Sequence, residues 1–199
     1  MKAYCINLKE RPDKWKLAER EFIREGIDVF RMDGIRIKGA QHSKELAHRG
    51  CIYSHAIALR LLRDYKQFAI FEDDVLFVNG GWKKTMEVMQ ELPVDWDMFY
   101  LGATLTRPLE RHSENIYRLK GGLTTHAIIY NNQHDIVDFI LDKANNAEKI
   151  DLLISRAQEL FNAYVISPFT CIQRAGKSDI LNRYTDYAII KDNEKKYML

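Results

Sequence analysis

Short apolar runs alternate with segments whose apolar residues recur at helical spacing. Their positions predict strands over 3–8, 29–31, 68–71, 97–101, 116–119, 125–130 and 163–166. They predict helices over 12–26, 50–65, 82–89, 132–144 and 151–161. Because strands and helices alternate, we expect an α/β sandwich with a mostly parallel central sheet. Ligands of such sheets bind beyond the carboxyl ends of the strands.

Three stretches lack such a pattern. Residues 33–49 are polar and carry two glycines and two histidines, which predicts a long loop, and residues 103–115 are also loop-like. Residues 191–199 are charged and predict a C-terminal tail. We therefore expect one domain over 1–190.

Composition and charge narrow the classes of protein. The 199 residues are 46% hydrophobic and 29% charged, which is typical of a globular chain. A net charge of +2 argues against nucleic acid as a partner. Cys5, Cys51 and Cys171 lack metal-ligand spacing and predict buried thiols in a reducing compartment. With neither a signal peptide nor a stretch of about 20 apolar residues, we expect a cytoplasmic protein. The sequence leaves peripheral contact with a membrane as an alternative.

An acidic cluster follows one of the predicted buried strands. Glu72, Asp73 and Asp74 come directly after the apolar run 68–71. Three adjacent carboxylates repel one another unless a cation or basic groups offset them. A hard divalent ion prefers such oxygen ligands and keeps positions for phosphate oxygens. The cluster predicts a metal–diphosphate platform, and the alternative is a solvated acidic turn.

Other polar residues are expected near this cluster. Asn7 and Arg11 end the first predicted strand, at the same edge of a parallel sheet as Asp73. Arg11 would pair with a phosphate or stand as a surface arginine at a helix start. His55 follows Ser54 one turn into a predicted helix. It would be a buried, hydrogen-bonded histidine or lie near an anion at the helix N-terminus.

Several segments together resemble glycosyltransferase family 25, which includes bacterial lipooligosaccharide galactosyltransferases and animal procollagen galactosyltransferases. The resemblance runs from about residue 3 to residue 181. It rests on these segments in order: Ile6-Asn7-Leu8 with Arg11, Gly50-Cys51-Ile52-Tyr53-Ser54-His55, Phe71-Glu72-Asp73-Asp74-Val75, Trp96-Asp97 with Leu101-Gly102, Thr125 to Tyr130, Ile150-Asp151, Pro168, Gln173 and Ser178-Asp179-Ile180.

The resemblance implies a GT-A fold, a Rossmann-like sandwich that binds a nucleotide sugar. It implies inverting transfer of a hexose, commonly galactose from UDP-galactose, with Mn²⁺ or Mg²⁺ held by Asp74 and Asp73. The residues it places at the donor are Asn7, Arg11, Ser54, His55, Glu72, Asp73, Gln173, Ser178 and Asp179. The base that deprotonates the acceptor is expected to be Asp151, with His126 as its rival. Asp151 would equally cap a helix. The acceptor is a lipooligosaccharide, another glycan or a protein.

The sequence is less typical of a hydrolase or of a binding module. A two-metal hydrolase needs more clustered ligands than one acidic box supplies. A Ser54–His55 nucleophile is disfavoured because neighbours on a helix point in different directions, and no nucleophile elbow surrounds them. A catalytically inactive module that binds a nucleotide sugar or a glycan stays open.

Overall fold

A central sheet of eight strands organises the protein, as seen in a computed structural model that describes residues 1–181 and 183–197. The strand order is β2-β1-β3-β10-β5-β11-β8-β7. The bounds are β1 Lys2–Leu8, β2 Phe30–Gly34, β3 Gln67–Glu72, β5 Met98–Tyr100, β7 Glu110–Arg111, β8 Ile116–Arg118, β10 Ala127–Asn131 and β11 Ala163–Ile166. β1 is parallel to β2 and β3, and β5 is parallel to β11. β10 and β8 run against their neighbours. The expected α/β sandwich with a mostly parallel sheet is confirmed.

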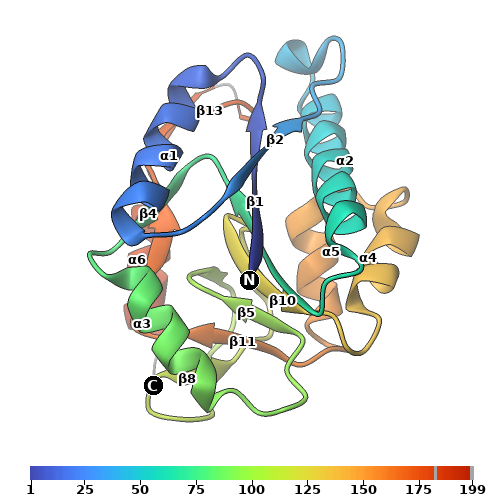
Figure 1. The fold of residues 1–199 in the computed structure, drawn as a ribbon. Coiled ribbons are helices and arrows are strands. Elements are labelled where there is room, and N and C mark those ends of the chain that lie inside the picture. The colour runs from blue at the N-terminus through green and yellow to red at the C-terminus, as the bar shows by residue number, and fades with distance from the viewer. Residues whose placement is uncertain (182, 198–199) are drawn as a thin grey trace.

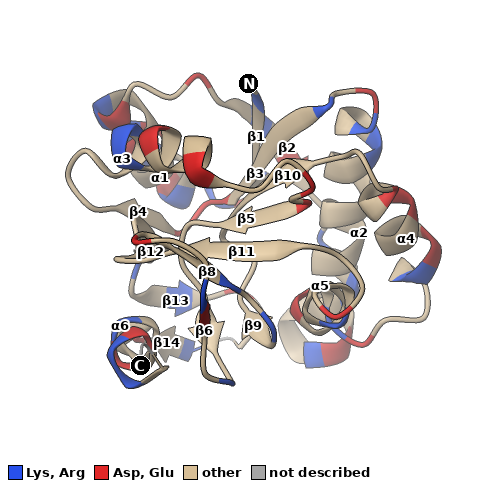
Figure 2. Cartoon of the chain, turned by 90° about the horizontal axis from the view of Figure 1, so that it is seen from below, with Lys and Arg blue, Asp and Glu red and all other residues tan. Residues whose placement is uncertain are grey.

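Helices cover both faces of this sheet (Figure 1). α1 (Pro12–Glu25) and α3 (Gly81–Val88) pack on one face. α2 (Lys44–Leu62), α4 (Ile136–Ala144) and α5 (Ile150–Ala157) pack on the other. Charged residues lie along α4 and α6, whereas the central strands β5 and β11 carry none (Figure 2). No helix in the described part of the chain is long and apolar enough to cross a membrane.

The pleat of the strands divides the interior into two cores. On β3, Phe68 and Ile70 join the core under α2, whereas Ala69 and Phe71 join the core under α1. Strand side chains alternate between the two faces, so both faces of this strand are apolar. The same alternation continues through Glu72, the last residue of β3, and into the turn that follows. It directs the Glu72 side chain toward α2 and the Asp73 side chain toward α1.

Short strands that the apolar pattern did not predict bring the C-terminal part of the chain to the sheet edge. β4 (Val75–Phe77) pairs with β12 (Cys171–Gln173), so that Val75 lies opposite Gln173. β13 (Gly176–Ser178) and β14 (Arg183–Thr185) form a hairpin. β6 (Thr104–Leu105) lies within the expected loop 103–115 and pairs with β9 (Gly122–Leu123), which follows that loop.

The expected loop over 33–49 is partly wrong. It contains the end of β2, a 3₁₀ turn (Ala40–His42) and the start of α2 at Lys44. Ser43 caps α2, because its side chain accepts a hydrogen bond from the Leu46 amide at 3.3 Å. His55 therefore lies well inside α2, and the expected anion site at a helix N-terminus beside it is wrong.

Most of the expected charged tail over 191–199 is helical in the structure. Residues Ala188–Tyr197 form α6, whose Ile190 is fully buried. The Glu194 carboxylate accepts hydrogen bonds from the Phe169 amide at 2.7 Å and from Ser167 Oγ at 2.8 Å. These contacts dock α6 on the rest of the domain. Residues 198–199 of the predicted tail lie outside the described residues.

Gly102 lies against another segment of backbone. A Cβ at this position would come within 2.1 Å of the Cys171 carbonyl oxygen. We expect Gly102→Ala to destabilise the fold by roughly 1–3 kcal/mol, because overpacking in a rigid interior forces backbone shifts. Urea unfolding would measure the loss. Gly176→Ala is the matched control, since a Cβ added at position 176 would meet nothing within 4 Å. Equal stability of the two variants would contradict the prediction.

Candidate active site

A cavity of about 440 Å³ opens where β1 and β3 end. Its walls come from α1, α2, the segment after β2, the acidic turn formed by Glu72, Asp73 and Asp74, and the chain after β12. The lining includes Arg11, Lys14, Arg36, Cys51, Ser54, His55, Glu72, Asp73, Asp74, Gln173, Ser178, Asp179 and Tyr187. The cavity thus occupies the position that the parallel-sheet rule predicts.

Asp73 turns toward α1, as the pleat of β3 requires. Its Oδ2 accepts a hydrogen bond from Asn7 Nδ2 at 2.6 Å, and its Oδ1 lies 3.6 Å from Lys14 Nζ. β1 and β3 are parallel neighbours with Ile6 opposite Glu72, which brings Asn7 beside the turn. Burial raises the pKa of Asp73 despite Lys14, and Glu72 and Asp179 raise it further.

Of the three carboxylates, that of Asp74 has the fewest side-chain partners. Gln173 Nε2 donates to its Oδ2 at 3.1 Å. Its Oδ1 is enclosed, and among the described residues it has no hydrogen-bond partner. Burial raises the pKa of Asp74 well above its usual value, and the charges of Glu72 and Asp73 add to the rise.

Glu72 turns toward α2 and is held there. Its Oε1 lies 3.1 Å from His55 Nε2 and accepts a hydrogen bond from Thr125 Oγ1. Burial opposes ionisation of this carboxyl, but the contacts with His55 and Thr125 lower the pKa of Glu72 to about 2. His55, 1% exposed, is the buried, hydrogen-bonded histidine of the sequence alternatives.

Three cations of the cavity lining converge on one carboxylate, that of Asp179. Arg11 donates to Asp179, Lys14 Nζ lies 2.9 Å from Asp179 Oδ2, and Arg36 Nη2 lies 3.1 Å from Asp179 Oδ1. Although burial opposes it, hydrogen bonds from Arg11 and Lys14 lower the pKa of Asp179. Arg11 also pairs with Asp13 at 2.8 Å, Lys14 lies 3.6 Å from Asp73, and Arg36 lies 3.7 Å from Glu10. An anionic ligand would therefore compete with these carboxylates for the three cations.

The acidic turn fits a hard divalent cation. Asp73 and Asp74 offer oxygen donors and no nitrogen or sulfur. Asp74 Oδ1 is enclosed and has no hydrogen-bond partner among the described residues. Burial raises the pKa of both aspartates, and Lys14 offsets this rise only in part. Oxygen donors of this kind favour Mn²⁺ or Mg²⁺ over softer metals.

Ser54 and Ser178 line the cavity but serve the backbone. Ser54 Oγ donates to the Gly50 carbonyl at 2.7 Å and accepts from the Ile35 amide at 2.8 Å. It therefore fastens the segment after β2 to α2. Ser178 Oγ accepts from the Leu181 amide at 3.1 Å.

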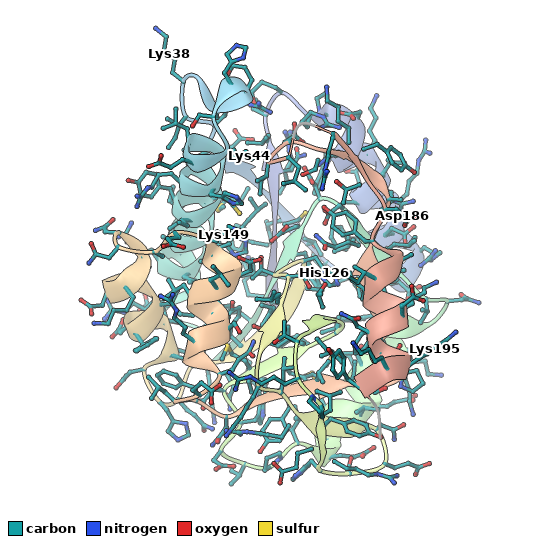
Figure 3. The ribbon with its side chains drawn as sticks, turned by 180° about the vertical axis from the view of Figure 1, so that it is seen from behind. Lys38, Lys44, His126, Lys149, Asp186 and Lys195 are labelled. Carbon is teal, nitrogen blue, oxygen red and sulfur yellow. The ribbon has the colours of Figure 1, made fainter. Side chains whose placement is uncertain are left out.

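Neither base candidate belongs to the cavity lining described above. His126 is fully buried, with Nε2 3.2 Å from the Cys171 carbonyl oxygen, and burial lowers its pKa. Asp151 lies in the first turn of α5, and its Oδ1 accepts from the Leu152 amide at 2.9 Å. Figure 3 shows His126 in the interior and Lys149 where α5 begins. Among the described residues, neither side chain hydrogen-bonds Glu72, Asp73 or Asp74, although the His126 carbonyl accepts a hydrogen bond from the Glu72 amide at 2.9 Å.

Sequence reasoning missed Lys14, Arg36 and Thr125. Lys14 is one turn beyond Arg11 on α1, so helical spacing carried a signal for it. Arg36 lies in the segment expected to be a loop, and Thr125 precedes β10. Their places depend on contacts between segments far apart in the chain.

Comparison with known proteins supports the fold. No protein-family model and no curated protein matches the chain. One similar solved structure is a glycosyltransferase involved in the glycosylation of the major capsid of PBCV-1 (TM-score 0.52, 9% identity, 98% of this chain and 97% of that chain). Another is A197 from STIV (TM-score 0.51, 12% identity, 92% and 93%). A third is galactosyltransferase LgtC in complex with donor and acceptor sugar analogs (TM-score 0.50, 9% identity, 100% and 97%).

These likenesses show that the chain has the GT-A fold of glycosyltransferases. At 9–12% identity they carry no family membership. The family 25 resemblance therefore stays a prediction.

Proposed function

We propose that this protein is a metal-dependent glycosyltransferase that binds a nucleoside-diphosphate sugar in the cavity at the ends of β1 and β3. The observation that carries the proposal is that one cavity holds two partly buried aspartates, Asp73 and Asp74, together with the cations Arg11, Lys14 and Arg36. A metal-bound diphosphate needs both parts. The glycosyltransferase fold supports the same conclusion.

Asp74 and Asp73 would hold Mn²⁺ or Mg²⁺. When bound, such an ion offsets the negative charge that grows on the leaving diphosphate as the glycosidic bond breaks. Arg11 and Lys14 would contact phosphate oxygens. Asn7 fixes the direction of Asp73, and Gln173 fixes that of Asp74. Asp179 would brace Arg11 and Lys14 so that both are ordered before the donor arrives.

In the transfer step, the acceptor hydroxyl oxygen attacks the anomeric carbon from the face opposite the diphosphate. The new bond to the acceptor forms as the bond to the diphosphate oxygen breaks, which inverts the anomeric centre. On the family resemblance we propose that Asp151, which lies outside the cavity lining, takes the hydroxyl proton. We propose galactose from UDP-galactose as the donor on the family resemblance, and a lipooligosaccharide, another glycan or a protein hydroxyl as the acceptor.

One observation favours a second candidate, an inactive module that binds a nucleotide sugar. Asp151 and His126 both lie outside the cavity lining given above. A module would bind the donor and never release UDP from it, whereas the enzyme would release UDP in the presence of metal.

A panel of nucleotide sugars tested by thermal shift, with and without Mn²⁺, examines the donor site without knowledge of the acceptor. A ligand at 100 times its Kd stabilises the native state by about 2.7 kcal/mol. At roughly 2–4 °C per kcal/mol for a chain of this size, the right donor should raise the melting temperature by about 5–10 °C. We expect UDP-galactose to do so only with Mn²⁺. Equal shifts with and without metal, or no shift with any nucleotide sugar, would contradict the proposal.

A further inference from the structure

A second group of ligand-bearing side chains lines the same cavity, beside the acidic turn. Cys51 and His55 are four residues apart on α2, a spacing that places both on one face of a helix. Glu72, at the end of β3, points toward that face. One possible ligand atom from each of the three residues lies within 4.8 Å of the others.

The geometry is close to that of a bound cation. Two ligands of one tetrahedral Zn²⁺, each at about 2.0–2.3 Å from the metal, lie roughly 3.3–3.7 Å apart. His55 Nε2 and Glu72 Oε1 are already 3.1 Å apart. One ligand atom of each residue lies within 4.8 Å of the others, so the thiol would have to approach by at most about 1.5 Å.

His55 is not fully satisfied by the protein. It is 1% exposed, and its Nε2 meets Glu72, but its Nδ1 is enclosed and has no hydrogen-bond partner among the described residues. Nε2 is the nitrogen that faces Glu72, so it would be the one to bind a cation held with Glu72, and the imidazole proton would then reside on Nδ1.

Cys51 also differs from the other two cysteines. Cys5 and Cys171 are fully buried in the core under α1, whereas Cys51 is half-buried and lines the cavity. Burial, together with Glu72 and Asp151, raises the pKa of the Cys51 thiol, so a bound cation would have to displace its proton.

We propose that Cys51, His55 and Glu72 form a site for a soft divalent cation, with Zn²⁺ as its ligand, separate from the Asp73–Asp74 pair. One sulfur, one nitrogen and one oxygen donor suit Zn²⁺, whereas the two aspartates offer only oxygen and suit Mn²⁺ or Mg²⁺. The two sites share a cavity but differ in the metal that each selects. This inference does not rest on the proposed transfer activity.

Titration of the metal-free full chain with Zn²⁺ and with Co²⁺ tests the site. We expect the wild type to bind Zn²⁺ at the cluster and Co²⁺ to give the near-ultraviolet absorption of a thiolate–cobalt bond. Cys51→Ser should abolish that absorption and weaken Zn²⁺ binding at least ~100-fold, which is the upper end of the loss from removing an outer-shell partner. Cys5→Ala is the matched control and should leave both unchanged.

A second variant separates the two metal sites. Asp74→Asn should keep the Zn²⁺ affinity and the cobalt absorption of the wild type. Zn²⁺ binding that survives Cys51→Ser at full affinity, or that disappears in Asp74→Asn, would overturn the proposal. Cys51→Ala replaces Cys51→Ser if circular dichroism shows that the serine variant is unfolded. No nucleotide sugar is present in these titrations, so their outcome is independent of whether the protein transfers a sugar.

Discussion

Asp74→Asn should abolish Mn²⁺-dependent donor binding, lower transfer at least ~100-fold and raise the melting temperature of the metal-free protein. The first two losses follow because the amide removes the charge of the proposed metal ligand and keeps its size. The gain in stability follows because burial, Glu72 and Asp73 all disfavour the charged form of Asp74.

The gain should depend on pH in a definite direction. The pKa of Asp74 is raised in the folded chain, so the folded chain binds a proton at pH values where the unfolded chain does not. The penalty of the charged carboxylate is therefore complete above the raised pKa and is relieved as the pH falls through it. The difference in melting temperature between Asp74→Asn and the wild type should be largest above the raised pKa and vanish below the ordinary pKa of an aspartate.

Calorimetry of metal-free protein across pH, with nucleotide binding measured in parallel, checks both effects. Asp64→Asn is the matched control, because Asp64 is an exposed aspartate outside the cavity lining. Asp64→Asn should change neither stability nor donor binding. An Asp74→Asn variant that binds the donor with Mn²⁺ as the wild type does would contradict the assigned role.

Asp151→Asn should leave donor binding unchanged and lower kcat by about 10²–10⁴-fold, the usual contribution of a positioned general base. The amide cannot accept the acceptor's proton. Glu148→Gln is the matched control, since Glu148 is exposed just before α5. Steady-state assays of UDP release with a known acceptor would measure kcat, and thermal shift would measure donor binding.

Near-full activity of Asp151→Asn would exclude Asp151 as the base. His126 would then have to become accessible, because its imidazole is fully buried against the Cys171 carbonyl. A helix-capping role for Asp151 predicts lower stability without a change in kcat at low temperature, so an unfolding measurement distinguishes it from a base.

The central part of the fold and the acidic turn were predictable from the sequence. The run Phe68–Phe71 is apolar on both faces because helices cover both faces of β3. A strand of that kind must end where polar residues begin, which places Glu72 and Asp73 at the sheet edge. The parallel pairing of β1 with β3 then brings Asn7 to Asp73.

Other parts of the site could not be predicted, for physical reasons. Strands of two or three residues, such as β4 and β12, carry no periodicity, so the contact between Gln173 and Asp74 has no local signal. α6 is charged on most of its surface and is docked by Ile190 and Glu194, which only the folded chain brings to their partners. The start of α2 was missed because its first turns are polar.

A crystal of the protein grown with UDP and Mn²⁺, with data collected at the manganese absorption edge, tests the central claim most directly. The account predicts one anomalous peak bounded by Asp74 and Asp73 and by the diphosphate, with Arg11 and Lys14 on the phosphate oxygens. UDP bound in the cavity without an anomalous peak at Asp74, or manganese bound elsewhere, would contradict it.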